Sequence, residues 1–207
     1  MPIAELNSSA SVRAGLITPE SFAKYGGVIS SRHQLKSNPS QSANYGTAVK
    51  QFKVVPVTNN YHSCDSGIPA EAHINMFRCS PPEHLISVGP HGDDYYTLKV
   101  LERHPYSTQT FFPMGVSKDD VAYMAVVAET LPNGLPNLAK LEAFICTGDQ
   151  AVTYGAGTWH APMIALNQTV DFGVLIHENG QPSEDCQEVY IKPGMQISFT
   201  KNINSHM

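Results

Sequence analysis

Short apolar or alternating runs follow one another along most of the chain, separated by Gly, Pro, Asn or Asp. Almost no segment repeats its apolar residues at helical spacing. This rhythm favours an antiparallel sandwich or barrel, because an α/β fold would need helices of about ten to fifteen residues between its strands. The runs that carry this prediction are AVKQFKVVPV, HINMFRC, YYTLKVLE, TQTFFPM, VAYMAVVA, LEAFIC, APMIAL, VDFGVLIH and EVYIKP.

A short helix is predicted near the N-terminus. Thr18 is a suitable N-cap, Pro19 fits the first helical position, and Gly26 is a stop signal. Two polar stretches, 30–44 and 59–72, lack periodicity and are expected to be surface connections. The fold class expected is therefore mainly all-β with a few short helices.

Length and composition predict one domain covering residues 1–207. The chain is 42% apolar and 15% charged, which is enough apolar material for one sizeable core. Its net charge of -5 and the lack of a Lys/Arg run argue against nucleic acid or a membrane surface as a partner. A small-molecule substrate remains compatible with this charge.

Compartment is inferred from signals that the sequence lacks. The first residues contain no apolar core of a signal peptide, and no window approaches about eighteen apolar residues, so we expect a cytoplasmic protein. The four cysteines are far apart and form no CxxC pair, which predicts free thiols. Cys146, within LEAFIC, is the one expected most strongly in the core.

Two segments combine residues that can carry chemistry. Glu102 and His104 are two positions apart, so on a strand their side chains point to the same face. In the segment 148–160, Gly155 and Gly157 predict a tight turn that places His160 on the following strand. The two segments together predict a site centred on Glu102, His104 and His160.

Both segments resemble the two motifs of the cupin superfamily, H-x-H-x4-E and G…P-x-G-x-x-H, which place four ligands around a metal in a double-stranded β-helix barrel. Glu102, His104 and Gln109 occupy the first three ligand positions, and His160 occupies the fourth. Only two of the three usual histidines are present, and Gly155 replaces the usual proline. The cofactor therefore stays open between none and a weakly held divalent metal on these four residues.

A closer resemblance, to the ureidoglycolate lyase family and its fungal branch, covers nearly the whole chain. It implies cleavage of (S)-ureidoglycolate to glyoxylate and urea in allantoin breakdown, a cupin-like barrel and a homodimer. An amidohydrolase name also used for this family would imply release of ammonia, but the lyase reaction is favoured. The matching blocks are LITPESFAKYGGVIS, YGTAVK, FRCSPP, LKVLERHPYSTQTFFPMG, AYMAVVA, AFICTGDQAVTYGAGTWHAPMIAL and VDFGVLIHE.

Such an elimination needs a base for the substrate hydroxyl and an acid for the departing nitrogen. We expect His104 or His160 to be the base, and the other histidine or Glu102 to donate the proton or orient the site. The order of these roles stays open. The competing interpretations are a strand-terminal surface histidine at His104, which precedes Pro105, and a buried structural histidine at His160.

The substrate carboxylate requires a cationic or polar partner. Arg78 is the first choice because its planar guanidinium can bind both oxygens, and Lys99 and Lys50 are alternatives. Each of these residues could instead be structural or solvent-facing. Three further side chains are candidates to bind the ureido group: Gln109, Tyr154 and Trp159.

Two other functions are compatible with the sequence. One is a metal-dependent cupin hydrolase or dioxygenase acting on a small polar metabolite, with the metal activating water or oxygen. The other is a non-catalytic cupin that binds a small metabolite, because this barrel hosts many functions.

Overall fold

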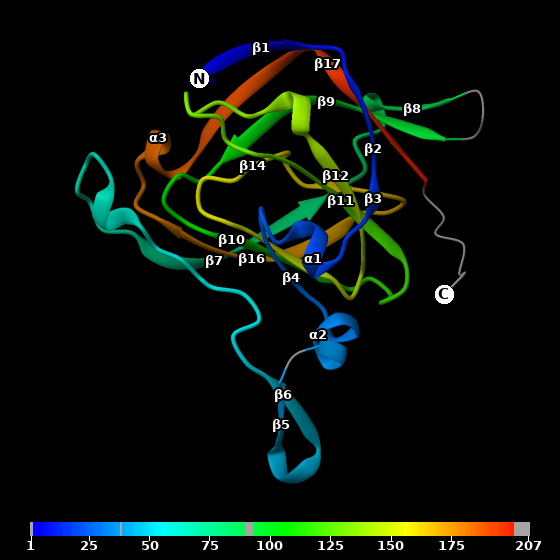
Figure 1. Cartoon of the computed structure of the whole chain (residues 1–207), viewed down its shortest axis with the longest axis vertical. Coiled ribbons are helices and arrows are strands. Elements are labelled where there is room, and N and C mark those ends of the chain that lie inside the picture. Colours follow the sequence, from blue (N-terminus) through cyan, green and yellow to red (C-terminus); the bar gives the residue numbers. More distant parts are fainter. Residues whose placement is uncertain (1, 38, 90–92, 201–207) are drawn as a thin grey trace.

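The computed structural model describes residues 2–37, 39–89 and 93–200, and its two large sheets consist mostly of antiparallel strands (Figure 1). The prediction of a mainly β, cupin-like fold is confirmed. Within the described residues, the larger sheet runs β1 (Ala4–Ser8), β17 (Gln187–Phe199), β9 (Asp94–Arg103), β14 (Trp159–His160), β11 (Val121–Ala128), β12 (Glu142–Thr147) and β3 (Gly15–Leu16), with β2 (Ser11–Arg13) beside β17, β8 (Ile86–Val88) beside β9 and β15 (Ile164–Ala165) beside β11. The smaller sheet runs β4 (Gly26–Ile29), β13 (Ala151–Tyr154), β10 (Gln109–Met114), β16 (Val170–Glu178) and β7 (Glu71–Cys79).

The first three strands depart from the antiparallel pattern. β1 and β2 pair in parallel with β17, and β3 pairs in parallel with β12. Because β1 lies beside β17, the N-terminal segment and the last long strand are joined by backbone hydrogen bonds. One edge of the larger sheet is thus formed by segments from distant parts of the described chain.

The helices are short, and the predicted start of the first one is confirmed. The Thr18 hydroxyl accepts a hydrogen bond from the Ser21 amide (3.1 Å), and the Ser21 hydroxyl accepts one from the Thr18 amide (3.0 Å). The helix ends before Gly26, which instead begins β4. The helices are α1 (Pro19–Phe22), α2 (Ser31–Ser37) and α3 (Pro182–Asp185), with 3-10 turns η1 (Asn44–Gly46), η2 (Tyr61–Ser63), η3 (Glu83–Leu85) and η4 (Leu138–Lys140). In the described part of the chain, no helix has the length and apolar character required to cross a membrane.

One of two apolar clusters lies between the two sheets. Phe172 of the smaller sheet packs edge-on against Tyr123 of the larger one, with ring centroids 5.3 Å apart. All residues of β11 are buried, because a second apolar cluster covers the opposite face of the larger sheet. Cys146 is fully buried in the core and all four cysteines are free thiols, as predicted.

Residues 30–44 are not the irregular loop that their polar composition predicts. They contain α2 and β5 (Ser40–Ala43), which pairs with β6 (Ala48–Gln51) to form an arm that projects from the body (Figure 1). The buried side chain of Gln34 fixes this segment, because it accepts a hydrogen bond from the Ser30 amide (2.6 Å) and donates one to the Val28 carbonyl (2.9 Å). These hydrogen bonds thus stabilise a segment whose sequence lacks the apolar periodicity of a helix or strand.

Candidate active site

Glu102 and His160 are brought together by strand pairing. They are register partners on β9 and β14, so their side chains lie on the same face of the larger sheet. Oε1 of Glu102 lies 3.6 Å from Nε2 of His160. The His160 side chain is 1% exposed and that of Glu102 is 19% exposed, so this pair is largely removed from water.

The glycine turn predicted before His160 is present and also contacts His104. Gly157 has φ +77, a conformation that favours glycine. Its amide donates a hydrogen bond to the His104 carbonyl (2.8 Å), and the Thr158 amide donates to the Gly155 carbonyl (3.0 Å). The turn therefore fixes the backbone of His104 relative to the residues that precede His160.

His104 follows the last residue of β9, and its side chain still reaches the same site. The ring centroids of His104 and His160 are 5.5 Å apart, and His104 is 8% exposed. One donor atom from each of Glu102, His104 and His160 lies within 4.8 Å of the others. The three residues that the sequence predicts as catalytic thus converge.

Backbone carbonyls define the tautomers of both histidines. Nδ1 of His104 lies 2.6 Å from the Asp185 carbonyl oxygen, and Nδ1 of His160 lies 2.9 Å from the Thr158 carbonyl oxygen. A carbonyl only accepts, so each Nδ1 carries a proton, and in the neutral form of each ring the lone pair is on Nε2. Both Nε2 atoms are buried without a hydrogen-bond partner among the described residues. Two buried acceptors are therefore available to a substrate or an ion.

The pKa values of both Glu102 and His104 are lowered, which leaves one residue charged and the other neutral. Burial raises the pKa of Glu102, but interaction with His160 and the nearby charge of His104 outweigh burial and leave it below its ordinary value. Burial and the charge of His160 lower the pKa of His104, partly opposed by the Asp185 carbonyl. At neutral pH Glu102 is therefore ionised and His104 is neutral.

Tyr154 and Gln109 form a polar wall beside the histidines. The Tyr154 ring stacks on the His160 ring with centroids 4.0 Å apart and an angle of 9°. Gln109 is the register partner of Tyr154 on β10. The Tyr154 hydroxyl and Gln109 Oε1 are buried without a partner among the described residues, and burial raises the pKa of Tyr154. Both side chains can therefore hydrogen-bond a ligand as neutral groups.

Trp159 lies outside the site, although it directly precedes His160 in the sequence. Adjacent residues of a strand point to opposite faces. Trp159 is fully buried in the second apolar cluster, its indole donates to the Gly134 carbonyl (3.1 Å), and the Arg103 guanidinium covers its ring at 4.7 Å. The structure does not bring Trp159 together with the histidines.

The cations considered for the substrate carboxylate also lie apart from the histidines or on the surface. The Arg78 side chain is 72% exposed and is bound at both Nε and Nη2 by Asp171, at 2.8 and 3.0 Å. Lys50 is on the arm, over the Phe52 ring. Lys99 is exposed on β9, three positions before Glu102.

The structure adds two site neighbours that the sequence analysis missed. Glu188 on β17 is the register partner of Glu102, and donor atoms of Glu102, Glu188 and Cys186 lie within 4.8 Å of one another. Burial, with the nearby carboxylates, raises the pKa of Cys186 to about 12, so its thiol is protonated at neutral pH. No sequence motif marks either residue, because β17 pairs with β9 from a distant part of the chain.

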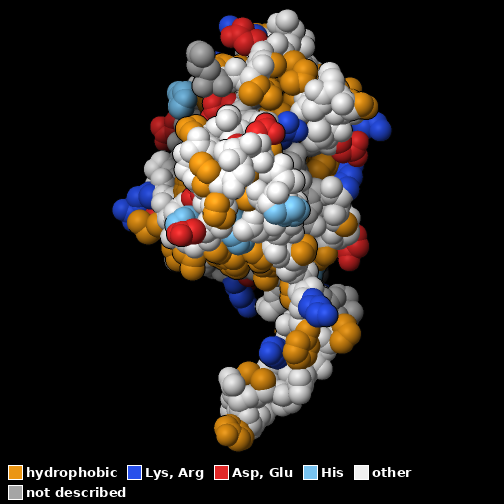
Figure 2. Space-filling view, turned by 90° about the vertical axis from the view of Figure 1, so that its left-hand side faces the viewer, with side chains coloured by type: hydrophobic (Ala, Val, Ile, Leu, Met, Phe, Trp, Pro, Cys, Tyr) orange, Lys and Arg blue, Asp and Glu red, His pale blue; other side chains and the backbone are white. Residues whose placement is uncertain are grey.

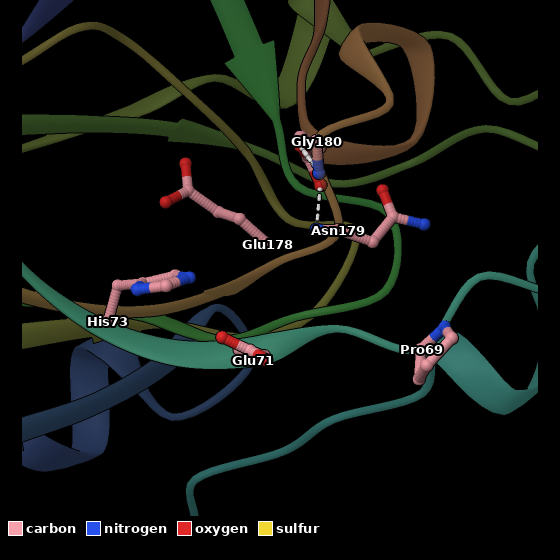
Figure 3. Close-up of a pocket in the computed structure, with 7 residues that line it drawn as sticks. Pro69, Glu71, His73, Glu178, Asn179 and Gly180 are labelled. Carbon is pink, nitrogen blue, oxygen red and sulfur yellow. Dashed lines mark hydrogen bonds between the residues drawn. The ribbon is translucent and has the colours of Figure 1, made fainter.

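A polar cavity of about 510 Å³ lies on the Asp185 side of His104. Figure 3 shows Glu71 and His73 on β7 and Glu178 on β16 along one side of it, with Pro69 on another. Glu71 and Glu178 are register partners, so two carboxylates face this space. The cavity favours ligand groups that donate hydrogen bonds or carry positive charge.

Two histidine nitrogens and a carboxylate form a donor set that fits a divalent metal. Each Nδ1 is anchored to a carbonyl, as is usual for metal-binding histidines, and each Nε2 is a buried acceptor without a partner among the described residues. The convergence of the three donors within 4.8 Å is compatible with coordination. The same features also suit proton transfer directly to a substrate.

Comparison with known proteins confirms the resemblance seen in the sequence. A family model described as ureidoglycolate lyase matches residues 9–198. The ureidoglycolate lyase of Saccharomyces cerevisiae is 44% identical over 193 residues, covering 88% of this chain and 95% of that protein. That of Schizosaccharomyces pombe is 38% identical, with 87% and 96% covered, and that of Burkholderia cepacia is 26% identical, with 91% and 90% covered. The chain therefore belongs to the ureidoglycolate lyase family.

Proposed function

We propose that this protein cleaves (S)-ureidoglycolate to glyoxylate and urea. The observation that carries the proposal is the pair of buried Nε2 acceptors on His104 and His160, next to the carboxylate of Glu102. Family membership supplies the substrate, because the relatives from both yeasts are named ureidoglycolate lyases. The metal-dependent hydrolase or dioxygenase receives no comparable support.

In this reaction one histidine accepts the proton of the substrate hydroxyl. The electron pair of the O–H bond forms the carbonyl of glyoxylate, the carbon–nitrogen bond breaks, and the departing nitrogen takes a proton to become urea. His104 suits the role of base because it is neutral, and its Nδ1 proton is held by Asp185. His160 suits proton donation because its Nε2 lies 3.6 Å from Oε1 of Glu102, and this carboxylate would stabilise the ring when Nε2 is also protonated.

The surrounding residues suit binding. Tyr154 and Gln109 offer the ureido group a hydroxyl and an amide from buried positions. Lys99 stays a candidate for the carboxylate because it shares β9 with Glu102, whereas Arg78 is neutralised by Asp171. If a divalent metal is bound, Glu102, His104 and His160 would hold it, with Gln109 as a fourth candidate, and it would polarise a substrate oxygen.

The direct test is an assay of purified protein treated with EDTA. We expect (S)-ureidoglycolate to yield glyoxylate and urea in equal amounts without ammonia, and (R)-ureidoglycolate serves as the control for stereochemistry. Release of ammonia would contradict the lyase assignment. Activity that returns only on adding a divalent metal would show that the donor set is occupied in the working enzyme.

We also propose that the protein is a homodimer formed through the outer face of the smaller sheet. Phe172 and Val174 of β16 point into the core, so Gly173 and its register partner Met76 are on the outer face. On this outer face Ile74 and Met76 are 82% and 72% exposed, and Phe112, which shares a register row with Met76, is 41% exposed. A solvated sheet face is normally polar, so a contiguous apolar face indicates an interface.

The dimer is tested by placing a charge on this face. Figure 2 shows hydrophobic side chains gathered on the part of the body above the arm. Ile74→Lys is expected to convert the dimer to a monomer in analytical ultracentrifugation, because burying an unpaired ammonium in an interface is costly. Val88→Lys is the matched control, because Val88 is 76% exposed on β8 of the other sheet. A dimer that survives Ile74→Lys would exclude this face.

We also propose that the protein is cytoplasmic and that it consists of a single domain. A cytoplasmic location is supported by the four free cysteines, two of them buried, which suit a reducing compartment. A single domain is supported by the pairing of β1 with β17, which joins distant parts of the chain in one sheet. Cell fractionation tests the location, and a single cooperative unfolding transition tests the domain.

A further inference from the structure

The carbonyl that orients His104 belongs to a residue that is itself held from three directions. Oδ1 of Asp185 accepts hydrogen bonds from the Tyr61 hydroxyl (2.6 Å) and the Asn179 amide (2.8 Å). Oδ2 accepts one from the Gly180 amide (2.8 Å). The carboxylate thus closes the turn before β17 and fixes the peptide whose oxygen receives the His104 Nδ1 proton.

Tyr61 is in turn packed against the residues that follow His104 in the sequence. It is 2% exposed, and its ring packs against Tyr106 with centroids 5.4 Å apart. The Asn60 amide donates to the Tyr106 carbonyl (2.7 Å), and Asn59 forms an isolated bridge with Ser107. The segment before Tyr61 therefore lies alongside the segment that follows His104.

A second connection ties the same loop to the same helix. The Glu184 carboxylate accepts hydrogen bonds from the Ser66 amide and hydroxyl, both at 2.7 Å, and from Asn179 Nδ2, also at 2.7 Å. The hydrogen bonds from Ser66 and Asn179 lower the pKa of Glu184 to about 2, so these contacts are made by an ionised carboxylate at neutral pH. Residues 61–66 are thus attached to α3 at both ends.

We propose that Tyr61 and Asp185 are positioning residues for His104. The Tyr61 hydroxyl holds the Asp185 carboxylate, and the Asp185 carbonyl then keeps the His104 ring in the Nδ1-protonated form with Nε2 directed at the site. The loop 59–70 thereby determines how the catalytic histidine presents its lone pair. Hydrogen bonds of this kind to a working histidine are worth about 10- to 100-fold in activity when lost. This inference rests on the catalytic role proposed for His104.

The test is Tyr61→Phe, which removes one hydroxyl and keeps the ring. We expect kcat to fall about 10- to 100-fold with KM changed less than about twofold, because substrate contacts remain and only ring alignment is lost. The ring ¹⁵N resonances of His104, assigned by their loss in His104→Gln, should move towards a mixture of tautomers. Tyr106→Phe is the control, because its ring is the neighbour of Tyr61 and its hydroxyl bonds to no described residue.

The outcomes separate this inference from the proposed function. Unchanged kcat and unchanged ¹⁵N resonances in Tyr61→Phe would overturn the positioning role. Shifted resonances with unchanged kcat would support positioning and remove His104 from the catalytic set. If Tyr61→Phe does not fold, Asp185→Asn replaces it, since it keeps the carbonyl and the side-chain size, and the same two readings apply.

Discussion

Replacing His160 by alanine is expected to lower kcat by about 10²- to 10⁴-fold, the usual contribution of a positioned proton-transfer group. Its Nε2 is buried, lies 3.6 Å from Glu102, and has no hydrogen-bond partner among the described residues. The proton that the departing nitrogen needs therefore has no equivalent source beside Glu102. The rate of glyoxylate release at saturating (S)-ureidoglycolate measures the effect.

The His160 result needs controls for folding and for histidine loss in general. His160→Gln keeps most of the volume against the stacked Tyr154 ring but cannot carry the proton, so it should be as inactive as the alanine variant. His84→Ala removes an exposed histidine of η3 and should keep the wild-type rate. A rate near wild type in both His160 variants would remove this residue from the mechanism.

Replacing Phe172 by alanine is expected to lower the free energy of unfolding by about 3–5 kcal/mol, the range seen for large aromatic residues in cores. Phe172 is fully buried between the sheets, and its ring packs edge-on against Tyr123 and Phe111 at 5.3 and 5.8 Å. The cavity would open where the two sheets meet. Urea unfolding, with the midpoint and slope compared between variants, measures the loss.

Phe52→Ala is the matched control for the core variant. Phe52 is 43% exposed and follows β6 of the arm, so the change should alter the unfolding free energy by less than about 0.5 kcal/mol. Equal losses in the two variants would mean that Phe172 does not pack in a core between the sheets.

The sequence predicts elements and the central trio well because both depend on local spacing. The apolar run of β11 indicates a strand whichever face it buries, and the two-residue spacing of Glu102 and His104 brings them to one side. The glycine pair before His160 requires a turn. These features need no knowledge of which distant strands pair.

Binding residues were harder to predict because alternation alone does not show which face points inward. The guanidinium of Arg78 favours it as a carboxylate ligand, yet Phe77 points to the inner face and Arg78 pairs with Asp171 on the outer face. Trp159 precedes a site residue and so faces away from it. Asp185 acts through its backbone carbonyl, which has no sequence signature, and Glu188 joins the site only through the pairing of β17 with β9.

The arm formed by β5 and β6 is also a place where a protease can reach the chain. Lys50 lies on β6 and Lys53 follows this strand, and both are exposed. Trypsin cuts after lysine, and cleavage at either position, as at the exposed Lys36, would separate the N-terminal part of the chain from all three residues of the catalytic trio. Cleavage after Lys53 would leave Glu102, His104 and His160 together on the fragment that begins at Val54.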